Sequence, residues 1–199
     1  MFLKKNFYYL ILFAFVAIIL LVLKNNNKSL DNKIGGDFVL TNQSGQKITN
    51  DSFKGYYRLV FFGFTHCPDF CPNTLNNVGE IINEIDKKDI LVPIFITVDP
   101  QRDTEMRLKK YLSNFHPKII GLTGSKEQIG GVKKKYKIFS KKVMDEADSS
   151  HNHDNHDHGG YGVDHTTILY LMDKNGYYLS HFSPEDSSDD IIKRINNLL

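Results

Sequence analysis

The chain has 199 residues, of which 41% are hydrophobic and 24% charged, and its formal net charge is +2. This length and composition suit one membrane segment followed by a single globular domain with a hydrophobic core. The positive excess belongs to the N-terminus, where Lys4, Lys5, Lys24 and Lys28 are the only charges among the first 28 residues. Residues 29–199 keep 21 of the 25 basic and all 23 acidic side chains. This near balance gives no support to a nucleic-acid-binding role.

An apolar segment without charges opens the chain at residues 7–23. Its length of about 17 residues is the short end of what crosses a bilayer core. No small-residue cleavage site precedes Lys24, so we expect an uncleaved anchor over residues 1–24, with a cleaved signal peptide as the alternative. The short basic end of a first anchor usually stays in the cytoplasm. We therefore expect a single pass through the inner membrane, with the domain on the periplasmic side, or in the intermembrane space of a mitochondrion.

A polar, asparagine-rich tether at 25–34 leads to the globular domain, which we place at residues 35–199. Two short strands are predicted at its start, at 38–40 and 46–48, because apolar residues there flank a turn at 42–45 that is rich in Asn, Ser and Gly.

A buried strand is predicted at 59–64, where apolar residues form a short run rich in aromatic and β-branched types. Residues 65–72 follow as a turn punctuated by prolines, and they contain both cysteines of the chain, Cys67 and Cys71. From Asn73 onward apolar residues recur at helical spacing, so we expect Cys71 at or just before a helix N-terminus. The free N–H groups and dipole of such a terminus favour a thiolate, which makes the pair reactive or competent to bind a metal.

Strands and helices then alternate along the chain. We predict a buried strand at 90–98, a helix at 104–115 capped by Asp103, a strand at 119–122, a helix at 125–136 that starts with a Ser125–Gln128 capping box, and a less buried strand at 137–143.

Residues 145–160 lose all hydrophobic periodicity, which predicts an exposed loop insertion. Two further strands, at 167–172 and 177–182, flank an Asn-Gly turn and should pair antiparallel. Ser183 is expected to cap a closing helix whose first residue is Pro184. This order specifies an α/β fold. We predict a thioredoxin-like mixed sheet flanked by helices, with one N-terminal transmembrane helix.

Two cysteines four residues apart leave four interpretations open. They can be inert core residues, or a structural disulfide whose very small loop would add little stability. They can be a redox dithiol, although C-x-x-C is the commoner spacing on this fold. They can be metal ligands, since two thiolates select Cu(I) or also Zn(II) and need at least one further ligand. The candidate for that ligand is His165, just before a predicted strand, with Asp164 placed to orient its ring.

Three blocks of the sequence resemble the signature blocks of the Sco/SenC family, at residues 62–72, 97–104 and 161–167. Members of that family are membrane-tethered, thioredoxin-like copper proteins that help to assemble the binuclear copper centre of cytochrome c oxidase. The resemblance covers about residues 35–199. It implies that Cys67, Cys71 and His165 bind copper, as Cu(I) or Cu(II), and that Asp99 supports copper loading. Thr166 stands where the family usually has serine, which keeps the hydroxyl group.

The resemblance predicts an anchored copper chaperone whose partners are a copper donor protein and the copper-binding subunit of cytochrome c oxidase. A thiol-disulfide reductase that acts on the cysteines of that subunit, or of other exported proteins, is the alternative. A thiol peroxidase is a weaker third, and the sequence does not decide whether the chain is an enzyme.

The histidines other than His165 raise two further questions. His66 either tunes the pKa of Cys67 as a nearby cation or is simply an exposed turn residue. Short histidine-rich tracts commonly bind Cu(II), Ni(II) or Zn(II) weakly, so an auxiliary copper or zinc site is expected in the loop, with a solvated loop of no metal function as the alternative. That tract contains His151, His153, His156 and His158.

Overall fold

The computed structural model describes residues 13, 15, 16, 33–144, 161–183 and 185–199. The chain divides into two compact units, Met1–Lys33 and Ile34–Leu199. Within the described residues, no helix is both long enough and apolar enough to span a membrane. The predicted anchor lies outside them except for Phe13, Phe15 and Val16, and so does the whole of the predicted loop at 145–160.

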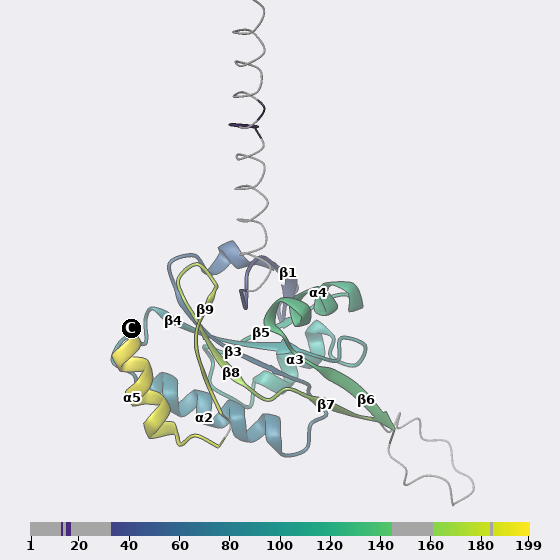
Figure 1. The fold of residues 1–199 in the computed structure, drawn as a ribbon. Helices are drawn as coiled ribbons and strands as arrows, with labels where there is room; N and C mark the ends of the chain where they lie inside the picture. Colours follow the sequence, from purple (N-terminus) through teal and green to yellow (C-terminus); the bar gives the residue numbers. More distant parts are fainter. Residues whose placement is uncertain (1–12, 14, 17–32, 145–160, 184) are drawn as a thin grey trace, which may run out of the picture. The chain divides into compact units, whose positions relative to one another are not determined.

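The second unit is built on a seven-stranded mixed sheet with the strand order β2-β1-β5-β4-β3-β8-β9 (Figure 1). The central strands β3, β4 and β5 run parallel, and the outer pairs are antiparallel. The bounds are β1 (Val39–Asn42), β2 (Lys47–Thr49), β3 (Tyr57–Gly63), β4 (Leu91–Thr97), β5 (Ile120–Thr123), β8 (Leu169–Met172) and β9 (Tyr178–Phe182).

Helices cover both faces of this sheet, which is why its central strands are continuously apolar. Along β3, Leu59 and Phe61 pack on one face with residues of α2 (Phe70–Glu84), α3 (Glu105–Leu112) and α5 (Ser188–Leu198). Val60 and Phe62 pack on the opposite face with residues of α4 (Lys126–Tyr136). Figure 1 shows α2 and α5 side by side, away from α4. The thioredoxin-like α/β fold predicted from the sequence is confirmed.

Helix α2 begins at Phe70, three residues earlier than the apolar spacing indicated. Pro72 is compatible with this start, because the first turn of a helix does not use its own N–H groups. Cys71 therefore lies in the first turn of α2, as expected for a cysteine at a helix N-terminus.

Two predicted helix caps are wrong. Helix α3 is capped by Thr104, whose hydroxyl accepts from the Arg107 N–H, so Asp103 is free for another role. Helix α5 is capped by Ser187, which accepts from the Asp190 N–H, while Ser183 belongs to a turn that precedes the helix. Thr104 and Ser187 are good caps in their own right, so the sequence offered two choices at each place.

A second, two-stranded antiparallel sheet consists of β6 (Ser140–Met144) and β7 (Tyr161–His165). We call it the β6–β7 ribbon, and Figure 1 shows it extending away from the main sheet. The sequence did not predict β7 as a strand. Thr166 fixes the base of the ribbon, because its N–H donates to the Phe139 carbonyl (3.0 Å) and its hydroxyl accepts from the Phe139 N–H (3.1 Å).

A buried arginine joins three segments at the start of β3. Arg58 is fully buried, and its guanidinium donates to the side-chain oxygen of Asn50 (2.7 Å) and to the Asn50 carbonyl (3.1 Å). The Asn50 amide donates to the Asn175 carbonyl (3.0 Å) in the β8–β9 turn. Gly176, in the same turn, has a φ of +85° and lies against both side chains. The turn that the Asn-Gly pair predicts must therefore also leave space for the Arg58 side chain.

Candidate metal and dithiol site

Both cysteines lie beyond the carboxyl end of β3, Cys67 in the loop that leads into α2 and Cys71 in the first turn of that helix. They are free thiols, and Cys71 is fully buried while Cys67 is partly exposed. The Cys67 N–H donates to the Phe64 carbonyl (3.2 Å), which turns the loop back on itself. The Cys71 N–H, one of the unpaired donors of the first helical turn, points to the Cys67 sulfur (3.4 Å). The helix start thus directs its partial positive charge at Cys67.

The two thiols are electrostatically different. A hydrogen bond from the Cys71 thiol, helped by the backbone N–H groups of Cys71, Phe70 and Asp69, lowers the pKa of Cys67 to about 5 against the cost of its burial. The same hydrogen bond to Cys67, together with burial, raises the pKa of Cys71. At neutral pH the pair is therefore one thiolate and one thiol.

This asymmetry predicts a pH profile for the reduced, copper-free chain. Only the thiolate is alkylated, so iodoacetamide should modify Cys67 rapidly at neutral pH, and the rate should fall as the pH drops through about 5. Mass spectrometry of quenched samples measures the rate at each cysteine.

The matched control is Cys71→Ala, which removes the hydrogen-bond donor. Its midpoint should move up toward the ordinary cysteine value of about 8.5. A midpoint near that value in the unmodified chain would contradict the assigned hydrogen bond.

A buried carboxylate holds the start of the cysteine loop. Asp103 is fully buried and accepts from the Thr65 N–H (3.0 Å), the Thr65 hydroxyl (2.6 Å) and the Thr97 hydroxyl (2.7 Å). It thereby joins the end of β3 to the end of β4. Sequence reasoning missed this role because it assigned Asp103 to the cap of α3. The available signal was topological, since adjacent parallel strands bring their carboxyl ends together.

His165 ends β7 and reaches the cysteine loop through Phe64. Its ring packs edge-on against the Phe64 ring, with centroids 5.5 Å apart. Its Nδ1 donates to the Val163 carbonyl (3.1 Å), and its Nε2 is buried without a hydrogen-bond partner. In the neutral ring the proton is therefore on Nδ1, and Nε2 presents a free lone pair, which is the form of imidazole that binds metals. Phe64 therefore contacts both His165 and, through its carbonyl, Cys67.

The three predicted ligands do not form a closed site. In the part of the chain that the structure describes, no group of three or more His, Cys, Asp or Glu side chains is close enough together to hold a metal ion. The His165 ring is oriented by a backbone carbonyl, in the role that the sequence suggested for Asp164, whose side chain is exposed. The donor set nevertheless fits copper, because cysteine sulfurs and an imidazole nitrogen are soft or borderline ligands.

Asp99 supports the ribbon that carries the histidine. It is buried, forms an ion pair with Arg102, and accepts from the Tyr161 hydroxyl at 2.9 and 3.0 Å. Arg102 lies over the Tyr161 ring (3.6 Å) and near the Phe64 ring (5.8 Å), and it donates to the Tyr161 carbonyl (3.0 Å). Sequence reasoning named Asp99 and missed both partners, although the i,i+3 spacing of Asp99 and Arg102 was a usable signal.

His66 is an exposed turn residue, which agrees with the second of the two interpretations above. Its Nε2 lies 2.6 Å from a terminal nitrogen of Arg107. Burial and the positive charge of Arg107 lower the pKa of His66, so the ring is neutral and accepts this hydrogen bond. It supplies no positive charge to Cys67.

A thioredoxin-like fold with a low-pKa cysteine at the end of a central strand defines a class of dithiol proteins that exchange electrons or bind soft metals. Within this class the chain belongs to the SCO1/SenC family, which it matches over residues 26–199. It is 44% identical over 166 residues to an SCO2-like protein of Rickettsia conorii, covering 83% of this chain and 77% of the relative.

Solved structures of relatives have the same fold. The structure of Bradyrhizobium japonicum ScoI with copper bound is 38% identical, with a TM-score of 0.71 over 83% of this chain and 99% of that one. Copper is the metal that the sequence predicts for this chain. BsSco, described as a member of the Sco family of cytochrome c oxidase assembly proteins with a disulfide switch, is 25% identical, with a TM-score of 0.61 over 84% of this chain and 94% of that one.

Proposed function

We propose that this chain is a membrane-anchored copper chaperone that assists assembly of the binuclear copper centre of cytochrome c oxidase. Cys67, Cys71 and His165 are its copper ligands. The observation that carries this proposal is the buried Nε2 of His165, which has no hydrogen-bond partner and shares Phe64 with the cysteine loop. A buried polar atom without a partner costs free energy, and a bound metal removes that cost.

The protonation states suit the binding of copper as cargo. Cys67 is already a thiolate at neutral pH, whereas Cys71 must release a proton when copper binds, and the Nε2 of His165 has no hydrogen-bond partner among the described residues. Two thiolates and one imidazole favour Cu(I) over harder ions. Since Cys67 is partly exposed, a partner's thiolate has access to the metal from that side.

The remaining parts of the proposal rest on the sequence. The charge-free segment at 7–23 is the anchor, and its short basic N-terminal end stays in the cytoplasm, so that the domain lies on the periplasmic side of the inner membrane, or in the intermembrane space of a mitochondrion. The partners are a copper donor and the copper-binding subunit of the oxidase. The histidine-rich tract at 151–158 is an auxiliary, weaker metal site, and it lies outside the described residues.

The test is Cu(I) binding by the full chain in detergent under reducing conditions, measured by competition with a Cu(I) chelator. Residues 151–158 are deleted in every sample so that weak sites do not mask the result. We expect one tightly bound Cu(I) per chain, lost in Cys67→Ser and in Cys71→Ser. A parent chain that does not retain one Cu(I) would refute the proposal.

A thiol-disulfide reductase is the second candidate, favoured by the split pKa values of the two cysteines. The Cys67 thiolate would attack a client disulfide and form a mixed disulfide with one client sulfur, releasing the other as a thiol. Cys71 would then lose its proton and attack the Cys67 sulfur, which releases the second client thiol and leaves a Cys67–Cys71 disulfide. Two electrons pass from the chain to the client. Reduction of a model disulfide by the copper-free chain measures this activity.

A further inference from the structure

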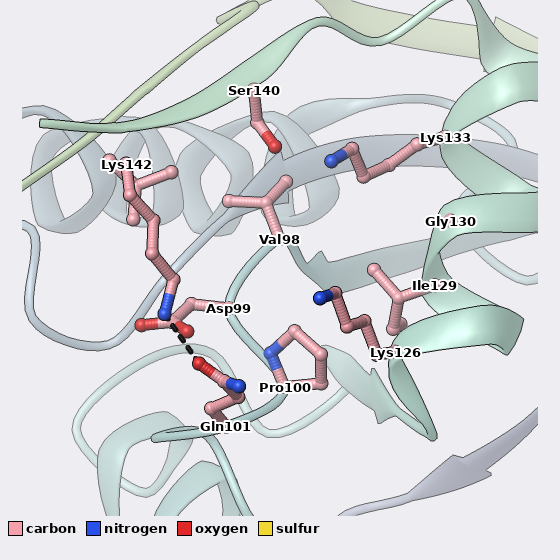
Figure 2. A pocket seen from close by; sticks show the side chains of 11 residues that line it. Val98, Asp99, Pro100, Gln101, Lys126, Ile129, Gly130, Lys133, Ser140 and Lys142 are labelled. Atoms are coloured by element: carbon pink, nitrogen blue, oxygen red, sulfur yellow. Dashed lines mark hydrogen bonds between the residues drawn. The ribbon is translucent and has the colours of Figure 1, made fainter.

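A pocket of about 440 Å³ lies between α4, the ribbon strand β6 and the turn after β4 (Figure 2). Three lysines line it, Lys126 and Lys133 from α4 and Lys142 from β6. Figure 2 shows the side chains of Lys126 and Lys133 reaching from the helix into the pocket, with Lys142 on its opposite wall. Neither cysteine and no histidine is among the residues that line it.

The positive charge in this pocket is not neutralised by the described residues. No ion pair joins Lys126 or Lys133 to a carboxylate in that part of the chain. Asp99 is the one carboxylate among the lining residues, and its oxygens are engaged by Arg102 and the Tyr161 hydroxyl. The pocket therefore holds three ammonium groups around a single carboxylate that is already paired.

The uncharged polar side chains of the lining are able to donate hydrogen bonds to an anion. Lys142 donates to the side-chain oxygen of Gln101, which leaves the Gln101 amide nitrogen as a donor. The Ser140 hydroxyl faces the same space (Figure 2) and is able to donate. Apolar residues form the remaining walls, which strengthens electrostatic interactions inside. A ligand that fits this lining is rich in acceptor oxygens and negatively charged.

The desolvation of Lys133 also favours a negatively charged ligand. Burial is the sole cause that lowers its pKa, with no nearby carboxylate acting in the opposite direction. A charged group that loses water without gaining a partner costs free energy. A bound anion would recover that cost.

We propose that this pocket binds an oxyanion of the phosphate class, held by Lys126, Lys133 and Lys142. Lysine is a compact point charge that binds phosphate without requiring a planar, two-pronged geometry. The ligand is either a free phosphate group or the headgroup of an anionic phospholipid, which have the same chemistry. The site is separate from the copper ligands, so the proposal does not depend on the function proposed above.

The test titrates the full chain in neutral detergent with inorganic phosphate at constant ionic strength, followed by calorimetry. We expect saturable binding that weakens about tenfold in Lys133→Gln and in Lys126→Gln, since each removes a charge-assisted contact. The matched control is Lys134→Gln, which makes the same charge change at an exposed position of the same helix. It should bind phosphate within about twofold of the parent.

Thermal melting of each variant confirms that it folds, so that weaker binding is not mistaken for unfolding. Absence of saturable binding by the parent, or equal weakening in Lys134→Gln, would overturn the site. Titration with a soluble short-chain phosphatidate then identifies the source of the oxyanion. Tighter binding of phosphatidate than of phosphate assigns the pocket to a lipid headgroup, and the reverse assigns it to a free phosphate.

Discussion

The His165→Ala variant should lose Cu(I) affinity by a factor of at least about 100, because even outer partners of metal ligands cost 10- to 100-fold when removed. The same variant should keep much of its dithiol activity, since the hydrogen bonds that lower the pKa of Cys67 come from Cys71 and the start of α2. Copper retention and reduction of a model disulfide are measured on the same preparation. In cells, oxidase activity should fall together with copper retention.

The matched control is His181→Ala. His181 is exposed on the edge strand β9, and its ring bonds to the Tyr178 hydroxyl (2.6 Å). This variant should retain copper like the parent. If His165→Ala retains copper as well, the imidazole is not a ligand. If His165→Ala loses dithiol activity to the same extent as copper, the two functions share this residue and the proposed separation fails.

Replacement of Gly176 with alanine should have the largest effect on folding. The residue has a φ of +85°, which an L side chain adopts only with strain. A Cβ atom there would overlap the Arg58 guanidinium and the Asn50 side chain. Because Arg58 is fully buried, its displacement would also leave a buried charge without its hydrogen bonds. We expect a loss of at least about 3 kcal/mol in the free energy of unfolding, measured by denaturant titration.

Gly131→Ala should change the free energy of unfolding in the opposite direction, as measured by the same denaturant titration. Gly131 lies inside α4, is exposed, and has no atom within 4 Å of an added Cβ. Alanine there should stabilise the chain by about 0.5–1 kcal/mol through helix propensity. Equal destabilisation of both variants would show that crowding around Arg58 is not the cause.

Local sequence patterns were sufficient to predict the elements that form the core of the domain and the cysteine loop. The apolar run at 59–64 and the helical spacing after Asn73 are short-range signals, and both describe the elements that position Cys67 and Cys71. The Asn-Gly turn likewise predicted the antiparallel pairing of β8 and β9, which the structure confirms.

Features that depend on distant partners were not visible in the sequence. Strand β7 is defined by its pairing with β6, and residues 145–160 separate the two strands along the chain. Asp103 bonds to Thr65 across 38 positions, and Tyr161 bonds to Asp99 across 62. Periodicity carries no information about such pairs. The two wrong caps have a different origin, since two adequate capping residues lie close together at each of these helix starts.

The proposed ligands belong to two different parts of the fold, the cysteine loop with the start of α2 and the β6–β7 ribbon, and this has a consequence for copper release. The cysteine loop is anchored in the rigid core by Asp103, whereas His165 belongs to a two-stranded ribbon, an arrangement that is marginal without outside contacts. The cysteine loop is therefore held by more of the fold than the ribbon that carries His165. Two contacts hold the ribbon in place, that of Arg102 with the Tyr161 ring and that of Phe64 with the His165 ring. A partner that displaces the ribbon would remove one of the three proposed ligands and leave two, so that copper would be held less tightly without any unfolding of the core.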